Sequence, residues 1–140
     1  MIIRALKNAF SLMKERNWDR IYFAIDLHGT VVKPNYSASE IPKDFYPDSK
    51  RVLQELTKRD DIALIMYTCS HPNEIVKYMD FFKENDIIFD HVNENPEVKT
   101  DYNGYGNYDK KPYMSVLMDD KAGFDGDTDW GLIKEYFKYK

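Results

Sequence analysis

The sequence predicts an α/β protein built on a Rossmann-like parallel sheet in a three-layer sandwich. Short apolar runs, rich in β-branched and aromatic residues, stand at positions 21–25, 62–67, 87–89 and 115–118, and each is too short for a typical helix. Segments with the spacing of amphipathic helices alternate with these runs. This alternation is typical of parallel strands joined by helices that cover both faces of the sheet.

The size and composition of the chain favour one globular domain over residues 1–140. Charged residues make up 31% and hydrophobic residues 43%, which excludes global disorder. The net charge is −4 and the basic residues form no block, so nucleic acid is not indicated as a partner. We expect a cytoplasmic protein with no membrane partner, because no apolar span could cross a bilayer and the single cysteine excludes an intrachain disulfide.

The N-terminal segment, residues 1–19, predicts an amphipathic helix over positions 2–18. Polar residues separate apolar residues that recur at helical spacing. The apolar set comprises Ile2, Ile3, Leu6, Ala9, Phe10 and Met13. We expect this face to pack on the sheet or on a partner subunit, and Asn17 to end the helix.

The first strand, 21–25, is a continuous apolar run that stops at Asp26. Such a run indicates a buried parallel strand, and Gly29 then marks a turn. Ligands of open α/β sheets bind outside the carboxyl ends of the strands. Asp26 is therefore the candidate reactive residue.

The next elements continue the alternation of strand and helix. A turn-rich segment at 33–47 precedes a helix expected from about 48 to 58. The strand at 62–67 ends at a run of hydroxyl and thiol side chains, and a helix follows from a cap near position 70 to about 85. The apolar stripe of this helix comprises Ile75, Tyr78, Met79 and Phe82. A shorter third strand is expected at 87–89.

The last part of the chain begins with a long polar loop at 91–110. Its length favours a functional segment, and the interleaved tyrosines indicate a partly ordered flap formed with Tyr102, Tyr105 and Tyr108. The strand at 115–118 then carries Asp119 and Asp120 at its tip, and Asp129 is expected to cap a final helix.

The strand tips together predict a metal and phosphate site. Parallel strands end at one edge of a sheet, so Asp26, Asp119 and Asp120 can meet in one cleft. These carboxylates would repel one another without a hard cation, and oxygen ligands of this kind suit Mg²⁺. Thr68, Lys111 and the amides of the Gly29 turn are suited to holding phosphate oxygens, and an aspartate beside them can act as a nucleophile.

At these residues the sequence resembles the haloacid dehalogenase-like (HAD) superfamily of phosphohydrolases. The family signatures correspond here to Asp26-Leu27-His28-Gly29-Thr30-Val31, Thr68, Lys111-Pro112 and Asp119-Asp120 with Asp125. They occur in the family order over residues 21–125, and the chain also resembles a small capless group within that superfamily. The gaps at 31–47 and 91–110 are too small for a substantial cap domain.

The resemblance implies a phosphomonoesterase that works through an aspartyl-phosphate and acts on a phosphorylated substrate. Asp26 would be the nucleophile and a Mg²⁺ ligand, and the backbone carbonyl of His28 a second ligand. Asp120 would bind Mg²⁺ directly and Asp119 through water, with Asp125 as a further acidic residue. Thr68, Lys111 and Gly29 would hold the phosphoryl group. An open site fits either a large substrate or a homo-oligomer that supplies the missing wall.

One departure from the family pattern leaves alternatives open. His28 stands where the family has a second aspartate, which protonates the leaving group and then activates water. A histidine can perform both tasks in principle. The alternative is a protein that kept the fold and binds phosphate or metal but lost turnover.

Two other phosphatase classes fit the sequence less well. The order Asp26-Leu27-His28-Gly29 also resembles the opening of calcineurin-like metallophosphoesterases, but the further motifs of that family are missing. A cysteine phosphatase would need an arginine six residues after its nucleophile, where this chain has Ile75. We therefore expect Cys69 to be a small buried side chain.

Overall fold

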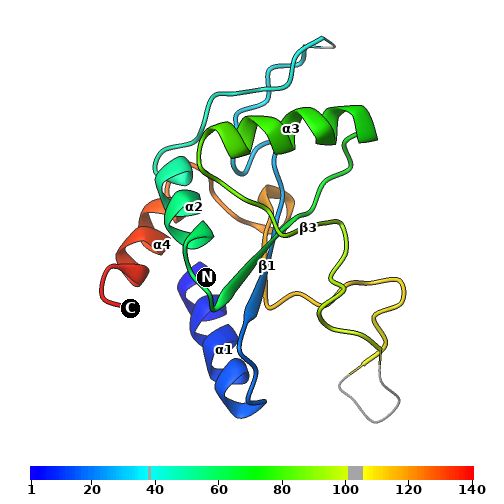
Figure 1. The fold of residues 1–140 in the computed structure, drawn as a ribbon. Helices are drawn as coiled ribbons and strands as arrows, with labels where there is room; N and C mark the ends of the chain where they lie inside the picture. Colours follow the sequence, from blue (N-terminus) through cyan, green and yellow to red (C-terminus); the bar gives the residue numbers. More distant parts are fainter. Residues whose placement is uncertain (38, 101–105) are drawn as a thin grey trace.

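The computed structural model describes residues 1–37, 39–100 and 106–140, and Figure 1 shows how their helices and strands are arranged. The elements are α1 (Ile2–Glu15), β1 (Ile21–Ile25), α2 (Ser49–Thr57), β2 (Ile62–Met66), α3 (Pro72–Glu84), β3 (His91–Val92), β4 (Val116–Met118), the short 3-10 helix η1 (Asp120–Ala122) and α4 (Asp129–Phe137).

The described strands form one parallel sheet in the order β3-β2-β1-β4, which confirms the predicted α/β class. Both central strands, β1 and β2, are buried at every position, as expected for strands covered on both faces. Because all pairs are parallel, the carboxyl ends lie along one edge. The strand order reverses between β1 and β4, and such a switch point is where open α/β sheets bind ligands.

One face of the sheet carries the main core. Phe23 of β1 points to this face, where the buried side chains include Leu6 of α1, Leu53 of α2, Phe82 of α3 and Trp130 of α4. Figure 1 shows α1, α2 and α4 together on one side of β1, with α3 near the carboxyl end of the strands. The helices thus bury the apolar faces that the sequence predicted against this face of the sheet.

The opposite face is covered by irregular chain. Tyr22, Ala63 and Ile65 point to this face and pack against Trp18 and Tyr113. Among the described residues no helix contributes to this cluster, so the expected third layer is a loop layer. The segment between β3 and β4 contains Pro96 and Pro112 and lacks helical spacing, which explains why its described residues, 93–100 and 106–115, cover the sheet without forming a helix.

The third strand does not lie at 87–89 as predicted. Its pairing residues are His91 and Val92, opposite Ile65 and Met66 of β2. The run at 87–89 has the alternation of a strand, because exposed Ile88 stands between buried Ile87 and Phe89. In the structure these two side chains enter the core from irregular chain. Asp90 then bonds to Leu64 through both its backbone N–H and its carboxylate, each at 2.8 Å.

Two helix ends also differ from expectation. The first helix ends at Glu15, two residues before Asn17, whose left-handed φ of 55° turns the chain toward β1. The last helix has Thr128 at its cap position, and Asp129 is its first residue. The Asp129 carboxylate instead accepts a hydrogen bond from the N–H of Asp125 at 2.9 Å.

The expected flap lies partly outside the described residues, because Tyr102 and Tyr105 fall in the segment 101–105. Tyr108 is described and packs edge to face against Tyr113, with ring centroids 5.5 Å apart. Across the described part of the chain, none of the helices is both long and apolar enough to cross a bilayer.

Candidate functional site

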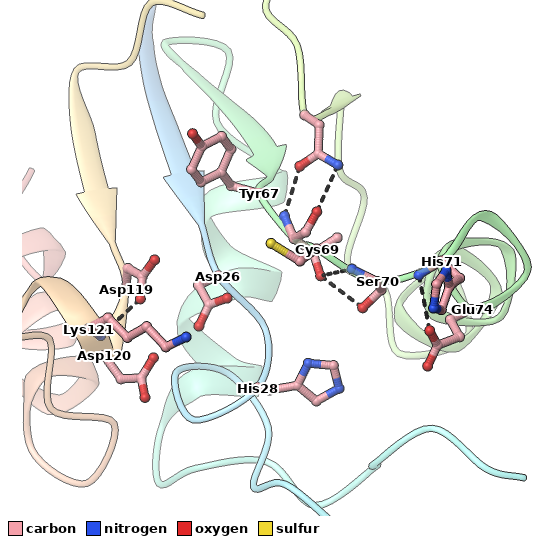
Figure 2. Close-up of a pocket in the computed structure, with 12 residues that line it drawn as sticks. Asp26, His28, Tyr67, Cys69, Ser70, His71, Glu74, Asp119, Asp120 and Lys121 are labelled. Carbon is pink, nitrogen blue, oxygen red and sulfur yellow. Dashed lines mark hydrogen bonds between the residues drawn. The ribbon is translucent and has the colours of Figure 1, made fainter. Parts of the chain in front are cut away.

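A pocket of about 720 Å³ opens at the carboxyl edge of the sheet. It is bounded by the residues that follow β1, β2 and β4 and by the first turn of α3, and Figure 2 shows the side chains that line it. The pocket includes the switch point between β1 and β4. Its position therefore agrees with where a sheet of this topology binds ligands.

Three carboxylates converge at this switch point. Asp26 follows β1, whereas Asp119 and Asp120 follow β4, and one oxygen of each lies within 4.8 Å of the others. The strand register causes this convergence, because Ile25 pairs with Met118 and the N–H of Asp26 donates to the carbonyl of Met118 at 2.9 Å. The structure thus brings together the acidic residues that the sequence placed at separate strand tips.

The Asp26 carboxyl group is held in an unusual electrostatic state. Burial raises its pKa to about 6, a hydrogen bond from Thr30 opposes this rise, and the carboxylates of Asp119 and Asp120 add to it. A divalent cation would compensate this repulsion. The donor set consists of carboxylate oxygens, which fit a hard cation such as Mg²⁺.

Thr30 connects the two acidic strand ends, and the sequence analysis assigned it no role. Its hydroxyl donates to Asp26 at 3.0 Å and accepts the N–H of Asp120 at 3.0 Å. Its carbonyl accepts the indole N–H of Trp130 at 2.8 Å. Thr30 is fully buried, so these bonds satisfy its polar groups and hold the acidic cluster in place.

Gly29 lies against the same cluster. Its φ of +80° is in the left-handed region, and a Cβ atom added there would lie 2.7 Å from a carboxylate oxygen of Asp120. Glycine is therefore required both by the backbone conformation and by the close approach of Asp120. Gly29 itself does not line the pocket, and the phosphate contact expected from the amides of this turn stays a prediction.

Thr68 lines the pocket from the end of β2, as predicted. Its N–H donates to the side-chain oxygen of Asn93 at 2.8 Å, and the Asn93 amide donates back to the Thr68 carbonyl at 2.9 Å. The Thr68 hydroxyl also lies 2.9 Å from that of Ser70. Asn93 was missed because it lies 25 residues further along the chain, in what the sequence identified only as polar loop.

The two predicted residues Lys111 and Asp125 lie elsewhere. Lys111 is exposed and does not line the pocket, whereas Lys121 does, and Figure 2 shows its side chain extending toward Asp26. Asp125 is exposed in the loop before α4 and accepts the N–H of Asp127 at 2.9 Å. Asp125 thus shapes a turn and does not join the acidic cluster. A lysine directly after the paired aspartates was the signal that could have identified Lys121.

His28 lines the pocket and contacts a residue that the sequence assigned only to the core. Its Nε2 is hydrogen-bonded to the hydroxyl of Tyr78 in α3.

Two further residues, His71 and Cys69, line the pocket near the start of α3. His71 occupies the cap position, where its N–H donates to Glu74 at 3.0 Å. Cys69 is exposed at the pocket, so the prediction of a buried thiol was wrong. The buried strand β2 ends at Met66, and Cys69 lies beyond it.

Comparisons with known proteins add support for the fold. No protein-family model matches the chain, and no curated protein matches it. The chain is similar to a solved structure described as a conserved protein from Bacteroides thetaiotaomicron. The TM-score is 0.62 at 22% sequence identity, covering 85% of this chain and 90% of the other. At this identity the likeness shows a shared fold.

Proposed function

We propose that this protein is a Mg²⁺-dependent phosphohydrolase of the capless HAD-like kind, which cleaves phosphomonoesters through an aspartyl-phosphate on Asp26. The observation that carries this proposal is the convergence of Asp26, Asp119 and Asp120 at the switch point of a parallel sheet. The capless assignment is supported by the connections after β1 and β3, which contain no helix among their described residues.

The acidic cluster and the backbone carbonyl of His28 would hold the Mg²⁺ ion, with Asp119 acting through water. When bound, the ion would neutralise the cluster and draw electron density from the phosphoryl oxygens. The residues of the chain are suited to this partner, because Asp26 is ionised more easily once a cation offsets the neighbouring carboxylates. Thr30 bonds to both the Asp26 carboxylate and the backbone N–H of Asp120, and these bonds fix the two residues relative to each other.

The reaction would proceed in two steps. In the first, a carboxylate oxygen of Asp26 bonds to phosphorus, the ester oxygen leaves, and His28 supplies the proton that this oxygen takes up. In the second, water attacks the phosphoryl group, its proton passes to His28, and inorganic phosphate leaves with Asp26 restored. Thr68 and the Gly29 turn would hold the phosphoryl oxygens during both steps.

The proposal departs from the sequence resemblance in the choice of the lysine that contacts phosphate. Lys121 lines the pocket beside the acidic cluster, whereas Lys111, which the resemblance implied, is exposed outside it. We therefore assign the phosphate contact to Lys121, whose ammonium group can reach an anion in the pocket. Lys121→Met should raise KM for a phosphomonoester more than Lys111→Met does.

A phosphate-release assay with a general phosphomonoester tests the proposal. Wild-type protein with Mg²⁺ should release phosphate, and Asp26→Asn should abolish this activity because the amide is not a nucleophile. Asp127→Asn is the matched control, since Asp127 is an exposed acid outside the cluster. Activity that is missing in the wild type and arises only in His28→Asp would instead support a binding protein that lost turnover.

A further inference from the structure

His28 and Tyr78 form a contact that the proposed reaction does not explain. The Tyr78 hydroxyl is hydrogen-bonded to Nε2 of His28, and the two rings meet edge to face with centroids 5.6 Å apart. Tyr78 is fully buried and stacks on Phe82 at 6.1 Å within α3. A tyrosine fixed in this way offers its hydroxyl from a constant position, so it can hold the imidazole in one orientation.

The direction of this hydrogen bond follows from the surroundings of Tyr78. Within the described chain its hydroxyl has no other hydrogen-bond partner, and a buried hydroxyl proton without an acceptor is unfavourable. If Nε2 of His28 carried the proton, the Tyr78 hydroxyl would be left in that state. The hydroxyl therefore donates and Nε2 accepts.

The protonation state of Tyr78 agrees with this direction. Burial raises the pKa of its phenol, and the carboxylates of Glu74 and Asp26 raise it further. The phenol thus keeps its proton throughout the neutral range and stays a donor. A neutral imidazole has one proton, so an Nε2 atom that accepts leaves this proton on Nδ1.

The free nitrogen of His28 faces the pocket. Figure 2 shows the ring between Asp26 and the start of α3, with one nitrogen directed to the centre of the pocket and the other toward α3. Since the hydroxyl of Tyr78 in α3 takes Nε2, the nitrogen that faces the pocket is Nδ1.

We propose that Tyr78 is a positioning residue that holds neutral His28 as its Nδ1–H tautomer and directs this N–H into the pocket, where it donates to an anionic oxygen. The identity of that oxygen, a phosphoryl or leaving-group oxygen, rests on the proposed function. The tautomer itself does not.

Nitrogen-15 NMR of the full chain tests the tautomer without reference to activity. In mildly alkaline solution, Nδ1 of His28 should have the shift of a protonated ring nitrogen and Nε2 that of an unprotonated one. The chain has three histidines, and the signals that disappear in His28→Asn identify the ring concerned. A wild-type spectrum with the proton on Nε2 of His28 would overturn the proposal, and this measurement needs no variant at Tyr78 to fold.

Tyr78→Phe removes the hydroxyl while keeping the ring. The His28 shifts should move toward those of free imidazole, in which the Nε2–H tautomer prevails, whereas Tyr136→Phe should leave them unchanged. Tyr136 is the matched control because it is a partly buried tyrosine whose ring stacks on Phe10 and does not line the pocket. Unchanged His28 shifts in a folded Tyr78→Phe protein would refute the positioning role.

A binding measurement connects the tautomer to the pocket. With Mg²⁺ present, Tyr78→Phe should raise the Kd for inorganic phosphate roughly three- to tenfold, the worth of one hydrogen bond. A changed tautomer with unchanged phosphate affinity would overturn the donor role. If the wild type releases no phosphate from any monoester, the proposed function fails while the NMR result for His28 stands, so the two failures are distinguishable.

Discussion

Replacing Asp26 with asparagine should stabilise the metal-free protein at neutral pH, although it should abolish activity. The reason is the cost of keeping this carboxylate ionised next to Asp119 and Asp120 in a partly buried position. Asparagine has nearly the same shape and carries no charge. Its side-chain oxygen can still accept the hydrogen bond from Thr30, so the variant removes the charge and little else.

The magnitude and the sign follow from the pKa of Asp26. In the folded protein this pKa is about 6, against an ordinary value of 3.8. Between these values the folded state binds the proton more tightly than the unfolded state, so stability falls as the pH rises. At about 1.4 kcal/mol per pKa unit, the loss is complete above pH 7 and amounts to about 3 kcal/mol, or about 2 kcal/mol after allowing for partial exposure.

Urea unfolding in EDTA, from pH 4 to pH 8, measures this difference. Asp26→Asn should exceed the wild type in unfolding free energy by about 2 kcal/mol at pH 7.5 and match it near pH 4. The exposed control Asp127→Asn should stay within about 0.5 kcal/mol of the wild type at every pH. The reasoning would be refuted by an Asp26→Asn protein no more stable than the wild type at pH 7.5, or by a gain independent of pH.

Further variants test the structures that surround the acidic cluster. Added Mg²⁺ should raise the Tm of the wild type and have a much smaller effect on Asp26→Asn, as thermal unfolding with and without EDTA would show. Gly29→Ala should lower the unfolding free energy by about 1–3 kcal/mol and weaken Mg²⁺ binding, measured by calorimetry, because its Cβ would displace Asp120. Thr30→Val should cost about 1–3 kcal/mol in urea unfolding, because the partly buried N–H of Asp120 and a carboxylate oxygen of Asp26 lose the fully buried hydroxyl that bonds to both. Asn93→Ala should leave kcat nearly unchanged but raise KM several-fold in a phosphate-release assay, because it frees the backbone of Thr68.

The sequence was most informative where a local pattern decides the structure. The strands at β1, β2 and β4 and the four long helices follow from runs and spacings that the chain displays within a few residues. The convergence of the acidic side chains was also predictable, because parallel strands necessarily end at one edge. The catalytic and metal-binding roles assigned to these side chains remain predictions.

The sequence was least informative where two distant segments must meet. The alternation of apolar and exposed residues at 87–89 has the period of a strand, but pairing with β2 begins only at His91. The backbone carbonyl and N–H of Leu64 are already bonded to the N–H and the carboxylate of Asp90. Similarly, the loop between β3 and β4 covers a sheet face for which a helix was expected. Neither outcome can be predicted from the local periodicity of the residues involved.

The sequence by itself determined the class of the fold and which carboxylates stand at strand tips, because periodicity and strand ends are properties of neighbouring residues. Only the tertiary structure decided which side chains surround those carboxylates. It placed Lys121 at the pocket and Lys111 outside it, and it brought Tyr78 to His28 and Asn93 to Thr68. These contacts depend on how α3 and the loop layer pack on the sheet. Such packing joins segments that are distant in the sequence, so the spacing of residues within one helix or strand does not predict it.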